Sequence, residues 1–102
     1  MKTIWKFKLE PELQQSIKMP KEHKVLSVGV TQGDLCLWAL VDAETEEYVY
    51  RTFYIVLTGQ DVPDEDVYFS GTIVLEDFVF HVYSLKGWDH GCLLYTSDAA
   101  DE

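Results

Sequence analysis

Hydrophobic and polar residues alternate with a period of two along most of the chain. The alternation is clearest over residues 3–9, where Trp5 and Phe7 share one face and Lys6 and Lys8 share the other. This pattern is typical of a β-strand with one buried face. The same alternation recurs over residues 24–30, 48–58, 67–75 and 78–85, and more weakly over residues 13–19. We predict a strand at each position, and we expect the weak one, which lies between two prolines, to be short or at a sheet edge.

Two of these segments carry further information. Residues 35–41, with the sequence LCLWALV, are apolar on both faces. Such a run is typical of a central strand that is covered on each side, so we expect it to be the most buried element. In the segment 24–30, alternation predicts that Leu26, Val28 and Val30 lie together on one face.

Glycine and acidic residues separate the predicted strands. Gly33 suits a tight hairpin turn, Glu76–Asp77 is a second turn, and residues 42–47 and 59–66 are acidic connections. Six or seven strands at this spacing, with no helical period, predict an all-β fold. We expect a single small antiparallel meander domain, either a sandwich or a partly open barrel. A chain of 102 residues leaves room for one such domain.

Charge narrows the classes of function. Lys and Arg total 8 against 18 Asp and Glu, which gives a net charge of -10 and argues against general DNA or RNA binding. No apolar run approaches the roughly 20 residues that span a bilayer, and the start lacks the apolar centre of a signal peptide, so we expect a soluble protein that is not exported and does not act on membranes. The charge is uneven, because the first 24 residues contain six lysines and three glutamates. Lys6 and Lys8 therefore either protect a sheet edge from aggregation or form a basic face for an anionic ligand.

Arg51 is the only arginine, and alternation places it on the same face as Val49 and Phe53. A charge on an apolar face needs a partner, which is either a nearby acid or the phosphate or carboxylate of a ligand. Thr58, Gly59 and Gln60, at the end of the same predicted strand, could add hydrogen-bond donors for such an anion. This group is the best candidate for a pocket.

The remaining candidate chemistry is sparse. The three histidines do not have the spacing of a metal site, the acidic runs do not have the spacing of a calcium loop, and no cofactor or catalytic motif is present, so we expect a protein that is not an enzyme. Two distant cysteines are expected to be reduced. The 14% aromatic content exceeds the need of one small core, so we expect tyrosine-rich faces to form a homo-oligomer or to stack on a base. The candidate ligand-binding residues are Arg51, Thr58, Gln60, Lys6, Lys8, His81 and Tyr83.

The last segment, CLLYTSDAADE at residues 92–102, differs from the rest of the chain. It resembles an in-frame translation of a transposase-type sequencing adaptor. We therefore expect the β-rich domain to comprise residues 1–91, with residues 92–102 as a non-native tail in which Cys92 has no functional role.

Four segments carry a resemblance to a known family: MKTIWKF at the start, CLWALVD at residues 36–42, RTFYIVLTGQ at residues 51–60 and FVFHVY at residues 78–83. Together they resemble a family of small β-rich proteins of tailed bacteriophages and prophages, across nearly all of residues 1–91. In relatives of this type a histidine usually follows the TG pair, whereas here Gln60 and an acidic insertion follow Gly59. The resemblance implies a phage accessory protein in the host bacterial cytoplasm and supplies no catalytic residue.

Small non-enzymatic phage accessory proteins often act against host defences. We therefore hypothesise a sponge, an oligomer that sequesters a nucleotide immune signal such as a cyclic dinucleotide or a cyclic ADP-ribose isomer. An acidic inhibitor of a host defence nuclease or CRISPR effector is the first alternative, because negative charge steers association with a basic nucleic-acid-binding surface. A structural or assembly role in the virion is the second.

Overall fold

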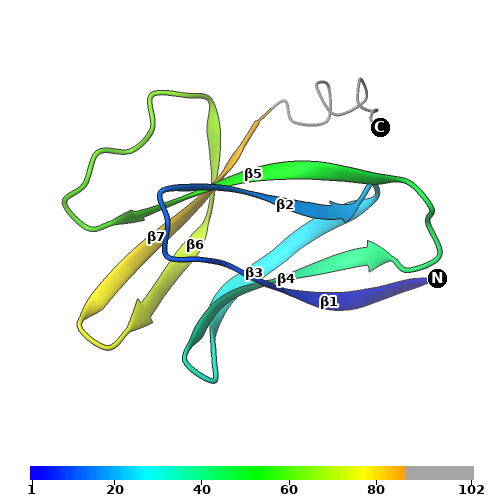
Figure 1. Ribbon diagram of the computed structural model, residues 1–102, viewed down its shortest axis with the longest axis horizontal. Helices are drawn as coiled ribbons and strands as arrows, with labels where there is room; N and C mark the ends of the chain where they lie inside the picture. The colour runs from blue at the N-terminus through cyan, green and yellow to red at the C-terminus, as the bar shows by residue number, and fades with distance from the viewer. Residues whose placement is uncertain (87–102) are drawn as a thin grey trace.

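Seven antiparallel strands make up most of residues 1–86, which are the residues that the computed structural model describes (Figure 1). The strands are β1 (Lys2–Lys8), β2 (Gln14–Pro20), β3 (His23–Thr31), β4 (Asp34–Asp42), β5 (Tyr48–Leu57), β6 (Val67–Leu75) and β7 (Phe78–Leu85). Each strand lies within about two residues of a segment predicted from the pattern of apolar and polar residues. The prediction of an all-β antiparallel fold is confirmed. No helix that could cross a membrane occurs within residues 1–86.

The strands form two sheets, one with the order β1-β4-β3 and one with the order β2-β5-β7-β6. Consecutive strands pair only in the β3–β4 and β6–β7 hairpins, so the order of a simple meander applies to these two units alone. The first hairpin turns at Gln32 and Gly33, with φ of 53° and 82°, and the second turns where Glu76 has a φ of 57°. Positive φ at both central residues of the first turn, and at the first central residue of the second, matches the right-handed twist of the paired strands. Both predicted turns are thus present.

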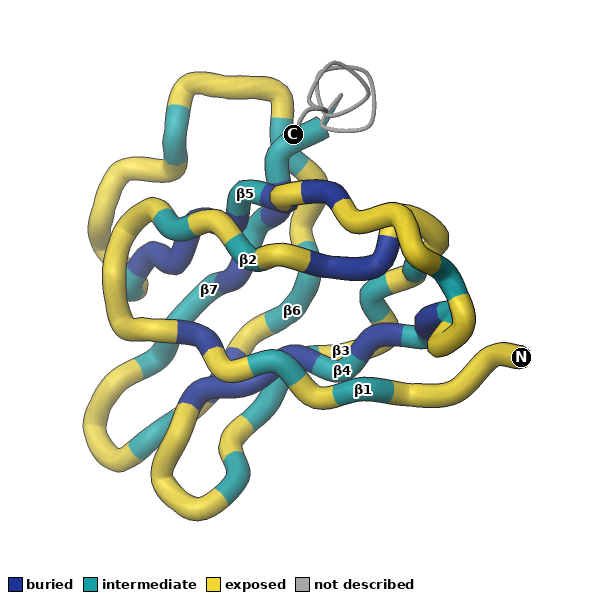
Figure 2. Tube along the Cα trace, turned by 45° about the vertical axis from the view of Figure 1, so that its right-hand side comes forward, coloured by how far each residue is buried: buried dark blue, intermediate teal, exposed yellow. Residues whose placement is uncertain are grey.

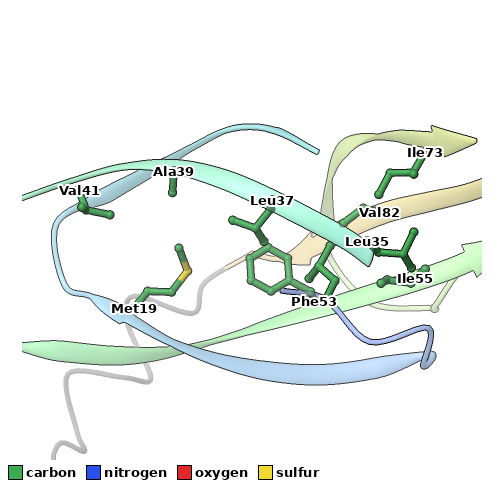
Figure 3. Close-up of a cluster of buried hydrophobic side chains, with 10 residues drawn as sticks. Met19, Leu35, Leu37, Ala39, Val41, Phe53, Ile55, Ile73 and Val82 are labelled. Atoms are coloured by element: carbon green, nitrogen blue, oxygen red, sulfur yellow. The ribbon is translucent and has the colours of Figure 1, made fainter. Parts of the chain in front are cut away.

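The two sheets enclose one apolar core. Figure 3 shows side chains of β4, among them Leu37 and Val41, pointing toward Met19 of β2 and Phe53 of β5. Phe53, Leu37, Met19 and Val41 have no exposed surface. β2 is an edge strand, as predicted, and its Ile17 packs against this core.

Two β-bulges change which residues face the core. The register of β3 shifts between Val25 and Ser27, so Val25 and Val28 pack on the core while Leu26 is 46% exposed. The prediction that Leu26 lies on one face with Val28 was therefore wrong, because one extra residue reverses the alternation beyond it. The second bulge, between Phe69 and Gly71 of β6, lies where β6 meets β3.

Within residues 1–86, the outer side of the three-stranded sheet β1-β4-β3 has no further layer of chain over it (Figure 2). β4 is the central strand of its sheet, as predicted, and its inward residues are fully buried. Its outward residues Trp38 and Leu40 are only half-buried. The expectation that this strand is covered on both sides was therefore wrong, and its apolar outer face is a surface.

Candidate ligand-binding face

Arg51 lies in the interior, with 8% of its surface exposed, on the same side of β5 as Phe53. Its Nη1 is 3.1 Å from His23 Nε2, and its Nη2 donates to Ser84 Oγ at 3.1 Å. The guanidinium carbon also lies 5.6 Å from the centre of the Phe53 ring. Because His23 is in β3 while Arg51 and Ser84 are in β5 and β7, this group links the two sheets.

The partners of His23 fix its protonation state in this network. Arg51 can only donate a hydrogen bond, so His23 Nε2 must accept one. The carbonyl of Pro20 can only accept, so His23 Nδ1, at 2.7 Å, must carry the proton. Burial lowers the pKa of His23 below 6.5, and the positive charge of Arg51 adds to this effect, while the bond to Pro20 opposes it. His23 is therefore neutral here and holds Arg51 in place.

The other predicted residues of the Arg51 group lie elsewhere. The side chain of Gln60 accepts a hydrogen bond from the Leu57 amide at 2.8 Å, which closes the turn after β5. His81 lies on the outer side of β7, where its two ring nitrogens contact the hydroxyls of Thr58 at 2.8 Å and Thr72 at 3.1 Å. Tyr83, two residues further along β7, lies on the same side. The structure thus brings Thr58, His81 and Tyr83 to one sheet face and separates them from Arg51.

The segment between β5 and β6 forms a hollow beside this face. Tyr54 Oη donates to Glu65 Oε1 at 2.6 Å, and this bond, with burial, raises the pKa of Tyr54 to about 12. The hollow has a volume of about 720 Å³, and its lining includes Asp61, Asp64 and Glu65. Three carboxylates make it unsuitable for a phosphate. Within residues 1–86, no three His, Cys, Asp or Glu side chains form a group that could hold a metal ion.

Basic residues gather instead on the outer side of the three-stranded sheet. Trp5 and Phe7 of β1 pack toward the core, so the intervening Lys6 and its neighbours at positions 2, 4 and 8 point outward. In the register, Lys6 is opposite Trp38, and Ile4 is opposite Leu40. Lys24 of β3 is opposite Leu40 on its other side. We call this surface the basic face; its residues are Lys2, Ile4, Lys6, Lys8, Lys24, Trp38 and Leu40.

Trp38 is at the centre of the basic face. A methyl group added at Gly29 would lie 3.2 Å from Cζ3 of its indole, so the ring rests directly on the backbone of β3 at this glycine. Ser27, opposite Trp38 on β3, is also small and exposed. The indole is thus a half-buried aromatic surface with small neighbours on one side and Lys6 on the other.

Cys36, two residues earlier in β4, is a buried free cysteine, and Cys92 lies outside the described residues.

The positive charge of the basic face is strongest near Lys6 and Lys24. Among residues 1–86, neither of these lysines forms an ion pair, whereas Lys8 has one with Glu10 at 3.9 Å. At the other end, Asp42 accepts a hydrogen bond from the Glu44 amide. This bond, together with the N-terminus and Lys2, lowers the pKa of Asp42 and keeps it ionised. The positive charge that no carboxylate of residues 1–86 pairs with therefore lies near the middle of the face, around Lys6 and Lys24.

Seven predicted residues thus occupy four places: the interior, a turn, and the two outer faces. Lys6 and Lys8 are on the basic face, as their alternation with Trp5 and Phe7 indicated. Sequence reasoning did not identify His23 as the partner of Arg51 or Trp38 as part of a site. A signal for Trp38 was present, because a strand that is apolar on both sides leaves apolar residues exposed wherever no second layer covers it.

Comparison with known proteins assigns the chain to a family, and this family has no known activity. No curated protein and no solved structure matches the chain. One family model matches residues 1–89, which is most of the chain and all of the described strands. The chain belongs to the family described as a domain of unknown function, DUF7352.

Proposed function

We propose that this protein binds a small nucleotide ligand on the basic face and does not act as an enzyme. The observation that carries the proposal is the grouping of Lys6, Trp38 and Lys24, three side chains from the three strands of one sheet. Lys6 is directly opposite Trp38, and Lys24 is opposite Leu40 in the neighbouring row. A nucleotide combines a flat base, which stacks on an indole, with phosphates, which attract ammonium groups. Neighbouring strands are about 4.8 Å apart, and two residues along a strand add about 6.6 Å. The backbones of the two lysines are therefore roughly 12 Å from each other, which is a distance that one small ligand spans.

The charge of the whole chain supports a small ligand over a nucleic acid. A net charge of -10 repels a long polyanion, which would approach the acidic segments as well as the lysines. A ligand confined to the basic face lies within about one Debye length, roughly 8 Å, of its lysines. For a mononucleotide or a cyclic dinucleotide, the attraction of the nearby lysines therefore outweighs the repulsion from the distant acidic segments.

The biological role that we propose is sequestration of a nucleotide immune signal by a phage accessory protein in the bacterial cytoplasm. Tight binding alone would suffice for such a sponge, and the resemblance to phage proteins supplies the setting. The alternatives are an acidic inhibitor of a host defence protein and a virion component. Two of the acidic residues an inhibitor would present are already engaged within the chain, because Glu65 accepts from Tyr54 and Asp66 lies 3.3 Å from Lys86.

A ligand panel with matched variants tests this proposal. The probes are cyclic di-AMP, cyclic di-GMP, cyclic ADP-ribose, AMP and ATP, measured by thermal shift and then by calorimetry, because a ligand that binds the native state raises its melting temperature. We expect one probe to bind, and the double variant Lys6→Ala/Lys24→Ala to weaken it at least tenfold, which is about 1.4 kcal/mol.

The control is Lys18→Ala/Lys21→Ala, which removes the same charge from outside the basic face. Lys18 lies over Tyr48, and Lys21 pairs with Glu47 at 3.4 Å. This control should bind the probe as the parent does. If no probe binds at millimolar concentration, or if both double variants weaken binding equally, the proposal is wrong, and capture of protein partners becomes the next step.

A further inference from the structure

The outer side of the four-stranded sheet exposes a continuous apolar surface on β6 and β7. Phe69 is 60% exposed and Val74 is 67% exposed. The Phe69 ring meets the Tyr83 ring edge-on, with 5.4 Å between their centres. Further along the two strands, Thr72 of β6 is opposite His81 of β7, which is itself opposite Val56 of β5. Two residues beyond Thr72, Val74 is opposite Val79 of β7. We call this surface the aromatic face; its defining residues are Phe69, Thr72, Val74, His81 and Tyr83.

The aromatic face contains no Asp, Glu, Lys or Arg. The outward positions of β6 are 67, 69, 72 and 74, those of β7 are 79, 81, 83 and 85, and all eight are apolar, aromatic, Thr or His. In a chain with 25% charged residues, an uncharged set of this size on a solvent-facing side is unexpected. The outward side of an antiparallel sheet normally carries charged and polar residues. An exposed apolar patch of this kind is typical of an interface.

The charge distribution identifies a second copy of this chain as the partner. In a symmetric dimer the same patch contacts itself, so any charged patch would oppose its own sign. The basic face would bring lysines against lysines, and the acidic segments would bring carboxylates against carboxylates. With a net charge of -10, two copies repel each other, and among the described surfaces only the aromatic face can meet its own image without unpaired like charges.

The area fits a weak dimer. Two strands about 4.8 Å apart, with segments of about eight residues at 3.3 Å each, give a patch of roughly 10 by 25 Å. Two copies would bury on the order of 500 Å², which is the size of a weak, transient contact. Pairing through an edge strand is less suited, because the bulge at Gly71 interrupts β6, and Pro20 lies in the other edge strand, β2.

We infer that the protein forms a symmetric dimer through the aromatic faces of two copies. The basic face is on the outer side of the other sheet, so this dimer presents two basic faces, one at each end. The inference does not depend on what the basic face binds, and a failure of ligand binding would leave it intact.

Light scattering after size exclusion, together with sedimentation velocity from 5 to 200 µM, tests the dimer. The parent chain of 11.8 kDa should approach twice this mass as concentration rises. Val74→Lys and Phe69→Lys should each remain monomeric, because a dimer would then have to bury a lysine from each copy without a partner of opposite charge. Leu26→Lys is the matched control, since Leu26 is 46% exposed on β3, in the other sheet, and this variant should dimerise as the parent does.

Val74→Lys should fold as the parent does, because the Val74 side chain is largely exposed and replacing it leaves the core intact. Its circular dichroism spectrum and its nucleotide binding should match those of the parent. A parent that stays monomeric at 200 µM, or a Val74→Lys variant that still dimerises, would overturn the inference.

Discussion

The two outer faces of this molecule are built alike and differ in charge. Each is the solvent-facing side of an antiparallel sheet with aromatic and aliphatic residues, which lie on the central strand β4 in the basic face and on the edge strand β6 and its neighbour β7 in the aromatic face. On the basic face, lysines from the two edge strands flank Trp38. On the aromatic face, Thr72 of β6 is opposite His81 of β7, and no charged side chain of residues 1–86 lies on this face beside Phe69 and Tyr83.

This difference teaches how a small chain can carry two separate surfaces. Charge at the rim of an apolar strip selects an anionic partner and opposes self-association, whereas an uncharged strip does the reverse. Both surfaces depend on the same interior, because the inward residues of both sheets form one core. Variants that disturb the interior should therefore affect both faces, and variants on one outer face should leave the other unchanged.

The largest expected effect comes from the contact that joins the two sheets at β3 and β6. Gly71 has a φ of 148°, and a methyl group at this position would lie 2.6 Å from Val28 Cγ2. Gly71→Ala should lower the free energy of unfolding by about 2–4 kcal/mol, from backbone strain and overpacking together. Urea denaturation measures this loss, and both ligand binding and dimerisation should weaken with it.

Two further variants separate the causes of that loss. Gly59 has a φ of 97° with no atom near its missing methyl group, so Gly59→Ala measures backbone strain alone. Adding Val28→Ala to Gly71→Ala should recover part of the stability by relieving the contact. If Gly71→Ala costs no more than Gly59→Ala, the close approach of the sheets at this point is not what holds them together.

A smaller effect is expected from the network of His23, Arg51 and Ser84, which also joins the sheets. The pKa of His23 is lowered in the folded protein, so below pH 6.5 the unfolded chain takes up a proton before the folded chain does. The stability from this group is therefore complete above pH 6.5 and is lost as the pH falls, by up to about 1.4 kcal/mol per pH unit.

His23→Gln tests this pH dependence. The glutamine amide oxygen can accept from Arg51, as His23 Nε2 does, and it does not titrate. Unfolding free energies from pH 7 to pH 5 should fall less steeply for His23→Gln than for the parent, with the carboxyl groups contributing equally to both. Equal slopes would show that His23 titrates normally and does not control the network.

The smallest effect concerns salt and should have opposite signs on the two faces. Raising sodium chloride from 50 to 500 mM screens the lysines, so nucleotide affinity on the basic face should fall several-fold. The same change screens the repulsion between acidic copies, so dimerisation through the aromatic face should strengthen modestly. Parallel calorimetry and sedimentation measure both, and a shared direction would mean that the two faces are not electrically distinct.

The sequence predicted the strands well because alternation reports directly on one-sided burial. Trp5, Phe7 and Phe53 all face the core as expected. The prediction failed at Leu26, because a bulge is a register property of paired strands and leaves no mark on the alternation of a single strand.

The candidate site was less predictable for a related reason. Alternation placed Arg51 inward correctly, but pairing it with His23 required knowing that β3 lies across the core from β5. In the same way, Lys24 belongs with Lys6 only because β4 lies between their strands. Sequence patterns assign residues to faces of strands, and strand order then decides which faces form one surface.

The central claim is that the two faces have separate partners, and amide chemical shifts test it most directly. A 15N-labelled sample would be titrated with each cyclic nucleotide of the panel and, separately, diluted from 200 µM. The account predicts that nucleotide shifts the amides of β1, β3 and β4 and the indole N–H of Trp38, while dilution shifts those of β6 and β7. Nucleotide-induced shifts centred on β6 and β7, or none at millimolar ligand, would contradict it.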